Sequence, residues 1–277
     1  RDTDRSRGLG DVYKRQGVKL VRVLGNLTTK EFDPILMLDS FDSINPDDYT
    51  AGFPMHPHRG IETISYVSRG KMVHRDSLGN EAGISDGEVQ WMNSGSGIMH
   101  EEMVPAAERL LGVQLWLNLP AKDKMSKPSY NSIKNEDIKE IEIEGGKIRL
   151  LAGKYGEHEG YKGDYLSMDY YDIHLNADAE VTLTMEEDDS VMVFTLLGDV
   201  YIDGEHIEEK TAVKLTEGDS LTIKNGNEKA QVLYMNSRAL NEPVAWAGPI
   251  VMNTQEELQK AFLELRSNTF IKETAEY

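Results

Sequence analysis

Residues 52–62 read Gly-Phe-Pro-Met-His-Pro-His-Arg-Gly-Ile-Glu, and residues 95–102 read Gly-Ser-Gly-Ile-Met-His-Glu-Glu. Both stretches combine strand-forming residues with glycine turns. Alternate side chains of an extended strand share one face, so His56 and His58 should point the same way, as should His100 and Glu102. Two neighbouring strands could therefore bring three imidazoles and one carboxylate together.

This set of side chains suggests a metal site. Three neutral imidazoles and a carboxylate suit a divalent first-row metal, whereas calcium and magnesium prefer shells made of oxygen. An ion with six coordination positions would keep two of them for water, dioxygen or a chelating substrate. A lone His-x-His motif also occurs without metal, where the imidazoles only form hydrogen bonds. Here three of only seven histidines lie at these positions, which favours metal binding.

The composition excludes several classes of protein. The chain has 48 Asp and Glu against 30 Lys and Arg, giving a formal net charge of −18 that disfavours direct binding to nucleic acid or membranes. Without cysteine, disulfides, thiolate chemistry and iron–sulfur clusters are unavailable. No apolar run approaches the ~18 residues of a membrane helix, and nothing resembles a secretory signal, so a cytoplasmic location is expected.

The pattern of elements predicts an all-β chain with two domains. Residues 1–16 lack hydrophobic periodicity and are expected to be a disordered or non-native tail. Short strands follow at a spacing of about eight to twelve residues, with glycine turns between them, which is typical of an antiparallel sandwich or barrel. The predicted divisions are a first domain over residues 17–120, a linker over 121–140, a second domain over 141–240 and an extension over 241–277.

The two halves resemble each other, which suggests an internal duplication. The segment Ile64–Gly70 aligns with Met192–Gly198, and Asp86–Asn93 aligns with Glu217–Lys224. On this alignment the second half lacks the metal-binding side chains: the residues opposite His56, His58, His100 and Glu102 are Thr184, Glu186, Gln231 and Leu233. The histidines of the second half are scattered and are not expected to bind a metal together; they are His158, His174 and His206.

The extension should end in a helix. Asn253 and Thr254 provide an N-terminal cap, and two glutamates follow in the first turn, where the helix dipole favours negative charge. Apolar residues then recur at helical spacing: Leu258, Ala261, Phe262 and Leu265. We expect this apolar face to pack on a barrel, with a partner-binding helix as the alternative.

Four motifs resemble those of the pirin family within the cupin superfamily: Phe53-Pro-Met-His-Pro-His-Arg-Gly-Ile-Glu-Thr63, Val89-Gln-Trp-Met92, Gly97-Ile-Met-His-Glu-Glu-Met103 and Gly248-Pro-Ile-Val-Met-Asn253. The resemblance covers approximately residues 17–272. It implies two antiparallel cupin (jelly-roll) β-barrels in tandem with a short C-terminal helix. It also implies one metal ion in the N-terminal barrel and none in the C-terminal barrel.

The resemblance also implies a ligand set. Typical cupins take the fourth ligand from a glutamate shortly after His-x-His, which would be Glu62. Pirins take it from the position that corresponds to Glu102, so the implied ligands are His56, His58, His100 and Glu102. Glu101 should point away. Glu62 is left as a residue that holds a ligand imidazole by its other nitrogen, or that forms an ion pair with Arg59 or Arg69.

Some pirins are similar in activity to quercetin 2,3-dioxygenase, which implies a flavonol and O2 as substrates. The ion would be Fe(2+), with Mn, Ni, Cu or Zn as alternatives. It would lower the pKa of the flavonol 3-hydroxyl, and Glu102 would take that proton as general base. Several apolar side chains could line a flat aromatic pocket or could belong to the core: Met55, Met92, Met99, Trp91 and Trp116.

A second hypothesis follows from the same resemblance. Pirins are also metal-dependent partners of transcription regulators and metabolic enzymes, so the chain could be a redox-sensing module with a protein partner. Such a module would present an exposed patch near Arg59, whereas an enzyme would hold a closed apolar pocket beside the ion. Structural zinc is a weaker reading, because such sites are usually rich in cysteine.

Overall fold

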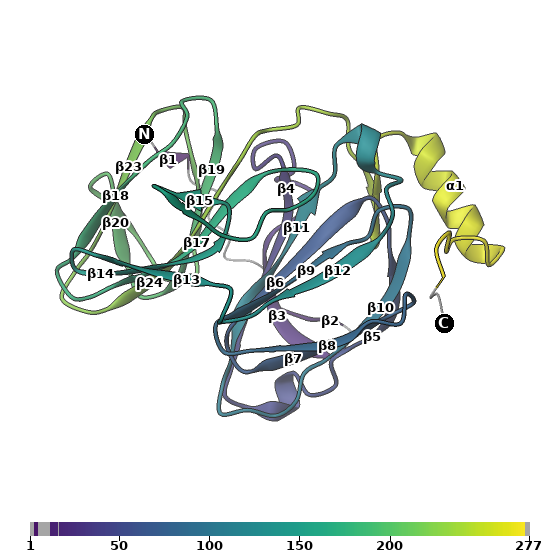
Figure 1. The fold of residues 1–277 in the computed structure, drawn as a ribbon, viewed down its shortest axis with the longest axis horizontal. Helices are drawn as coiled ribbons and strands as arrows, with labels where there is room; N and C mark the ends of the chain where they lie inside the picture. The colour runs from purple at the N-terminus through teal and green to yellow at the C-terminus, as the bar shows by residue number, and fades with distance from the viewer. Residues whose placement is uncertain (1–2, 5–11, 16, 275–277) are drawn as a thin grey trace. The chain divides into compact units, whose positions relative to one another are not determined.

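The computed structural model describes residues 3–4, 12–15 and 17–274, with side chains from residue 17 onward (Figure 1). The chain forms two compact units. The name "first barrel" is used here for the described part of residues 11–29, 35–134 and 240–277. The second barrel is the described part of residues 1–10, 30–34 and 135–239.

The first barrel contains a seven-stranded sheet, in the order β12-β9-β6-β11-β4-β3-β2, and a four-stranded sheet, in the order β5-β10-β7-β8. Neighbouring strands in both sheets are antiparallel. The strands are β2 (Val12–Arg15), β3 (Val18–Leu24), β4 (Ile35–Ser43), β5 (Phe53–His58), β6 (Ile61–Arg69), β7 (Lys71–Asp76), β8 (Glu81–Ser85), β9 (Glu88–Asn93), β10 (Ile98–Met103), β11 (Leu110–Asn118) and β12 (Ser129–Ile133).

The second barrel repeats this plan. Its seven-stranded sheet has the order β1-β22-β19-β24-β17-β14-β13 and its four-stranded sheet the order β18-β23-β20-β21. The strands of these sheets are β1 (Thr3–Asp4), β13 (Lys139–Ile143), β14 (Gly146–Ala152), β17 (Met168–Leu175), β18 (Glu180–Thr184), β19 (Ser190–Leu197), β20 (Val200–Ile202), β21 (Glu205–Ile207), β22 (Ala212–Leu215), β23 (Ser220–Asn225) and β24 (Ala230–Ser237). A separate two-stranded sheet is formed by β15 (Lys154–Tyr155) and β16 (His158–Glu159). The predicted fold, two tandem cupin barrels, is confirmed.

A shared β-bulge fixes the correspondence between the two barrels. Where β11 pairs with β6 the register skips Ser68, and where β24 pairs with β19 it skips Leu196. Ser68 therefore corresponds to Leu196, as the predicted alignment of Ile64–Gly70 with Met192–Gly198 requires. A bulge at the same point of the same strand pair is strong structural support for a duplication.

The second predicted alignment is wrong. By strand order β9 corresponds to β22, and β10 corresponds to β23. His74 and Ile202 are equivalent, because each lies four residues after the aligned glycines Gly70 and Gly198. His74 pairs with Glu102 and Ile202 pairs with Ile223, so the counterparts of His100 and Glu102 are Leu221 and Ile223. The error arose because two similar acidic-glycine turns lie in different connections: Gly87 is between β8 and β9, whereas Gly218 is between β22 and β23. The counterpart of His56 is Leu183, one residue from the predicted Thr184.

The C-terminal extension is part of the first barrel. It forms a hairpin of β25 (Ala245–Ala247) and β26 (Ile250–Met252), followed by α1 (Gln255–Arg266). Thr254 and Glu257 form a capping box at the start of the helix, which typically stabilises a helix by about 1 kcal/mol. Leu258 and Ala261 pack against the hairpin, and Ile250 bridges to the backbone of Arg59. The predicted helix is confirmed, but its apolar face packs on this hairpin and on Phe270 rather than on the sheets of a barrel.

Two predicted segments need comment. Residues 121–140, expected to be a linker, contain the 3-10 turn Ala121–Asp123 and strand β12, which pairs with β9. Of the tail expected over residues 1–16, the backbone at Thr3–Asp4 and Val12–Arg15 is paired as β1 and β2, and the rest lies outside the described residues. No helix in the described part of the chain has the length and apolar character needed to cross a membrane.

Candidate metal centre

Strands β5 and β10 are neighbours and bring three of the four predicted ligands together. His100 lies opposite His56, and Ile98 lies opposite His58. One ring nitrogen from each of His56, His58 and His100 lies within 4.8 Å of the others. His58 and His100 are buried, each about 1% exposed, whereas His56 is partly exposed. The group therefore opens toward solvent on the side of His56.

The hydrogen bonds of His56 and His58 fix their tautomers. Nδ1 of His56 lies 2.8 Å from the carbonyl oxygen of Pro54, and Nδ1 of His58 lies 3.0 Å from that of Pro249. A carbonyl oxygen only accepts hydrogen bonds, so in both neutral rings the proton is on Nδ1. The two Nε2 lone pairs then face each other at 3.1 Å. Nitrogens bound to one ion at about 2.1 Å, at a right angle, would be about 3 Å apart.

His100 is oriented by a relay that ends at a carboxylate. Nε2 of His74 donates to Oδ2 of Asp76 at 2.7 Å, and Nδ1 of His74 lies 3.4 Å from Nδ1 of His100. With the His74 proton on Nε2, its Nδ1 accepts from the Nδ1–H of His100. This arrangement leaves a lone pair on Nε2 of His100, a buried atom with no hydrogen-bond partner in the described structure. Such support from a carboxylate is typical of metal-binding histidines.

Electrostatics in this relay favour neutral imidazole and ionised carboxylate. Burial holds the pKa of His100 well below its ordinary value, and the neighbouring imidazoles of His58, His56 and His74 lower it further. Burial acts to raise the pKa of Asp76, but hydrogen bonds from His74 and Asn80 outweigh it and bring that pKa below its usual value. Protons and a metal ion compete for the lone pair of an imidazole, and a lowered pKa reduces the competition from protons. These shifts therefore suit a metal ligand.

His74 was not identified in the sequence as part of the site. It is completely buried and stacks on the ring of Tyr130 at a centroid distance of 4.0 Å. A signal was present, because His74 and Asp76 alternate on one face of a predicted strand. His74 reaches His100 because β7 pairs with β10, and this pairing could not be predicted from the sequence.

Glu102 follows His100 by two residues on β10, past a bulge, and its carboxylate is not among the possible ligand atoms that lie within 4.8 Å of one another. It is buried, at 1% exposed, like His100, whereas Met99 and Glu101 on the other face are partly exposed. The side-chain amide of Gln90 donates to Oε1 of Glu102, and that of Gln114 lies 3.1 Å from both carboxylate oxygens. The ligand role of Glu102 remains a prediction.

The predicted roles of Glu62 and Arg59 need correction. The Nδ1 atoms of the three clustered histidines contact Pro54, Pro249 and His74, so Glu62 does not fill that place. Arg59 is 2% exposed, pairs with Glu264 at 2.7 Å and lies over the Phe270 ring at 4.2 Å. Hydrogen bonds from Arg59 and Lys272 hold the pKa of Glu264 below its usual value, although burial opposes them. Arg59 is therefore not part of an exposed patch.

The apolar residues near the site divide into core and surface. Trp91, Met92 and Trp116 are buried, whereas Met55 is half exposed. Trp116 meets the ring of His58 edge-on at a centroid distance of 5.1 Å. It packs with Met37, Ile61 and Val251 in one apolar cluster.

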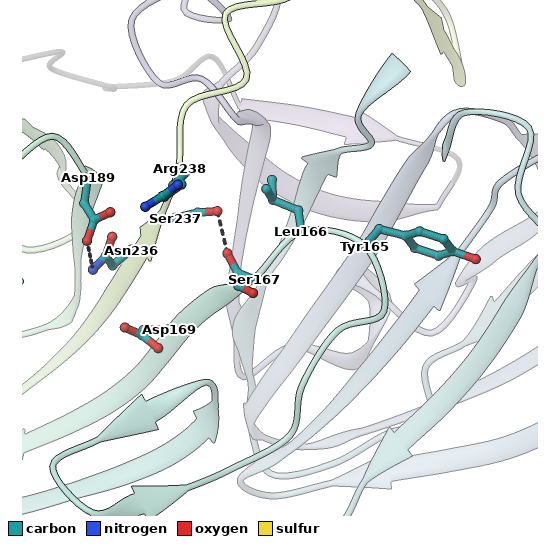
Figure 2. A pocket seen from close by; sticks show the side chains of 8 residues that line it. All are labelled: Tyr165, Leu166, Ser167, Asp169, Asp189, Asn236, Ser237 and Arg238. Carbon is teal, nitrogen blue, oxygen red and sulfur yellow. Dashed lines mark hydrogen bonds between the residues drawn. The ribbon is translucent and has the colours of Figure 1, made fainter. Parts of the chain in front are cut away.

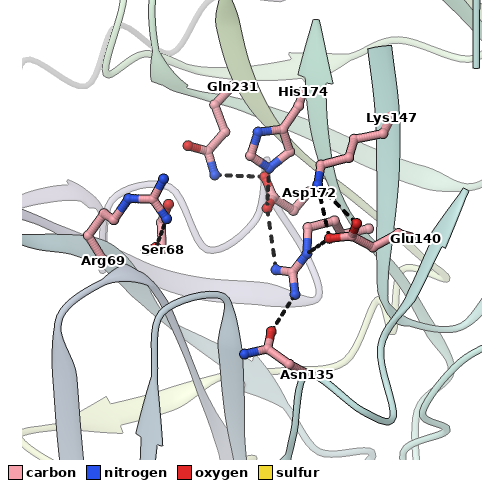
Figure 3. Close-up of polar contacts among 9 residues, drawn as sticks. Ser68, Arg69, Asn135, Glu140, Lys147, Asp172, His174 and Gln231 are labelled. Atoms are coloured by element: carbon pink, nitrogen blue, oxygen red, sulfur yellow. Dashed lines mark hydrogen bonds and ion pairs between the residues drawn. The ribbon is translucent and has the colours of Figure 1, made fainter. Parts of the chain in front are cut away.

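The histidines of the second barrel have other partners. Nε2 of His174 lies 2.8 Å from Asp172, which also accepts from Gln231 and faces Arg149 (Figure 3). Nε2 of His206 lies 3.0 Å from Asp199, and His158 is exposed on β16. Among the described residues, the group of side chains placed to hold a metal ion is the one formed by His56, His58 and His100.

The fold and this site define a bicupin whose three histidines, in the first barrel, could hold a divalent metal. The chain belongs to the pirin family: the Pirin profile matches residues 17–117, and the profile of the Pirin C-terminal cupin domain matches residues 170–271.

Named relatives agree with this assignment. A Pseudomonas aeruginosa protein provisionally named quercetin 2,3-dioxygenase is 38% identical, over 90% of this chain and 91% of its own length. Human pirin is 35% identical, over 91% of this chain and 87% of its own. The crystal structure of a quercetin 2,3-dioxygenase from Acinetobacter baumannii matches with a TM-score of 0.89 and 29% identity, covering 98% of this chain and 99% of that one.

Proposed function

We propose that this protein is a metal-dependent dioxygenase that cleaves quercetin-type flavonols with O2. The observation that carries the proposal is the convergence of three imidazoles whose Nδ1 atoms point to other partners, so that their Nε2 lone pairs face a common point. The names of the Pseudomonas and Acinetobacter relatives supply the substrate class.

The donor set fits a divalent metal, for which we propose Fe(2+), held by His56, His58, His100 and Glu102. Two features favour a cation. Nε2 of His100 is buried without a partner, and the two other Nε2 atoms oppose each other at 3.1 Å. The carboxylate of Glu102 is buried among neutral amides, and a buried charge is costly unless an opposite charge compensates it. When bound, the ion would lower the pKa of the flavonol 3-hydroxyl.

The residues of the chain then perform the proton transfer. Glu102 takes the proton of the 3-hydroxyl as general base, and the amides of Gln90 and Gln114 hold its carboxylate in place. Gln114 is itself fixed by Ser65 at 2.9 Å. In the overall reaction both atoms of O2 enter the ring-opened product, and the C3 carbon of the flavonol leaves as carbon monoxide.

The test is an incubation of the iron-loaded protein with quercetin and oxygen, following flavonol absorbance and carbon monoxide. We expect metal-dependent loss of flavonol with stoichiometric carbon monoxide, and no loss with His58→Ala or His100→Ala. Full iron occupancy without flavonol loss would reject the dioxygenase. It would favour the second hypothesis, a redox-sensing module that binds a transcription regulator or a metabolic enzyme.

A further inference from the structure

One end of the second barrel carries a cluster of polar side chains, formed by Asp169, Asp189 and Asn236 (Figure 2). Each of these residues is two positions from a member of the apolar core, namely Tyr171, Val191 or Tyr234. Because alternate residues of a strand share a face, all three continue the inward-facing rows of β17, β19 and β24. They therefore form the last interior layer of three neighbouring strands.

Asn236 is the most buried member of the cluster, at 7% exposed. Its side-chain amide donates to Oδ2 of Asp189 at 2.9 Å, and its Oδ1 is buried with no hydrogen-bond partner among the described residues. Asp169 lies opposite Asn236 in the pairing of β17 with β24. Burial raises the pKa of Asp169 and the nearby charge of Asp189 adds to this, although hydrogen bonds from the backbone N–H of Lys154 and from Tyr171 oppose it. The cluster thus holds two adjacent acids and one unused carbonyl oxygen.

The cluster lies in the wall of two clefts. The larger has a volume of about 630 Å³ and includes Tyr155, Leu183, Met185 and Glu186 in its lining. The smaller has a volume of about 410 Å³ and includes Arg238. The larger cleft is within the usual size range of small-molecule sites. Three acids face it, against the single lysine Lys154, so its formal charge is negative.

We propose that the larger cleft binds a small organic amine, a primary ammonium group on an apolar body. An ammonium has three N–H donors, and the cluster offers three acceptors: the carboxylates of Asp169 and Asp189 and Oδ1 of Asn236. The apolar body lies against Tyr155, Leu183 and Met185. A calcium ion needs six to eight oxygen ligands, which suits this partly aromatic lining less well.

The first barrel shows that the fold does not require these polar residues. From the paired registers, the counterparts of Asp169, Asp189 and Asn236 are Met37, Ile61 and Trp116. Those three side chains are buried together with Val251 of the C-terminal hairpin. The acidic cluster is thus specific to the second barrel. If these positions had only a structural role, apolar residues such as those of the first barrel would fill it.

The experiment is a calorimetric titration of the full, metal-loaded chain with 2-phenylethylamine. The comparison probes are 2-phenylethanol, which lacks the charge, and calcium chloride. The variants are Asp169→Asn and Asp189→Asn, which keep the side-chain shape, with the exposed Glu180→Gln of β18 as matched control. Thermal unfolding of each variant verifies that it is folded.

We expect the amine to bind, with affinity lowered about tenfold or more in both aspartate variants and unchanged in Glu180→Gln, because each aspartate variant replaces a charged acceptor by a neutral amide. The alcohol should not bind measurably. Three results would overturn the proposal: no amine binding to the parent chain, equal binding to folded Asp169→Asn, or calcium binding at these aspartates without amine binding.

Discussion

The two barrels share one frame and differ in where they place polar groups. Deep in the first barrel lie Ser65, Gln90 and Gln114, whose counterparts in the second are the apolar core residues Val193, Val213 and Tyr234. The same holds for the site itself, because His56, His100 and Glu102 correspond to Leu183, Leu221 and Ile223. The second barrel shows that an apolar interior satisfies the fold, so the polar interior of the first has another purpose.

At the ends of the barrels the pattern is reversed. The first barrel has Met37, Ile61 and Trp116 under Val251, whereas the second has two aspartates and an asparagine facing a cleft. Burying polar groups costs free energy unless they find partners. The two polar layers are therefore the places where a ligand is to be sought, a metal in one barrel and an amine in the other.

The largest expected effect separates the barrels by their histidines. Replacing His58 or His100 by Ala should abolish iron binding, because each removes one of three converging nitrogens. Replacing His174 of the second barrel should leave binding intact, since that ring contacts Asp172. Elemental analysis of the purified variants measures the difference. Undiminished iron in the first two variants would refute the ligand assignment.

The next effect concerns Glu102. Glu102→Gln preserves size but removes the charge and the base, so we expect quercetin turnover to be lost and iron affinity to fall about tenfold or more. Stopped-flow or spectrophotometric assays with matched iron loading separate the two effects. Glu101→Gln, on the opposite face of the same strand, is the control and should keep both properties. Equal activity in the two variants would contradict the role given to Glu102.

A smaller effect tests the relay behind His100. Asp76→Asn should weaken iron binding about 10- to 100-fold, because His74 would lose the partner that fixes its tautomer. The matched control is Asp199→Asn, which removes the aspartate partner of His206 in the second barrel. Competition with a chelator gives the affinities, and the ligand-field spectrum of the bound metal reports any change at His100. A purely structural role for Asp76 would leave that spectrum unchanged.

The smallest effect concerns the contact between the C-terminal hairpin and the rest of the first barrel. The ammonium of Lys124 donates to the carbonyl oxygens of Gly60 and Val251, at 2.8 and 3.1 Å, and burial lowers its pKa to about 7 from an ordinary 10.5. At pH values between 7 and 10.5, Lys124 is protonated in the unfolded chain but mostly neutral in the folded chain. The free energy of unfolding should therefore rise with pH from 7 to 10.5, by up to about 1.4 kcal/mol per pH unit from this group.

Denaturant unfolding across that pH range measures this slope. Lys124→Met should lose it, whereas Met at the exposed Lys260 of α1 should retain it. Equal slopes in the two variants would show that Lys124 keeps its proton throughout.

The sequence predicted the parts of the molecule that depend on local pattern. Strand alternation placed His100 and Glu102 on one face, and capping chemistry placed the helix start at Thr254. Contacts that arise from strand pairing were not accessible. The relay through His74 requires β7 beside β10, and the burial of Arg59 requires the C-terminal residue Phe270.

The duplication shows the same limit. One glycine turn, at Gly70 and Gly198, correctly related the two halves, because it is followed by the same strand order in both. The other, at Gly87 and Gly218, joined strands that are not equivalent. Turns that combine an acidic residue with glycine recur at several connections between strands, so they do not identify a particular connection.

The most direct test is anomalous diffraction from crystals of the full chain loaded anaerobically with ferrous iron. We expect one iron peak in the first barrel, within bonding distance of Nε2 of His56, His58 and His100 and of a carboxylate oxygen of Glu102, and no peak in the second barrel. Iron bound elsewhere, or a well-folded protein that takes up no iron, would contradict the assignment of this site.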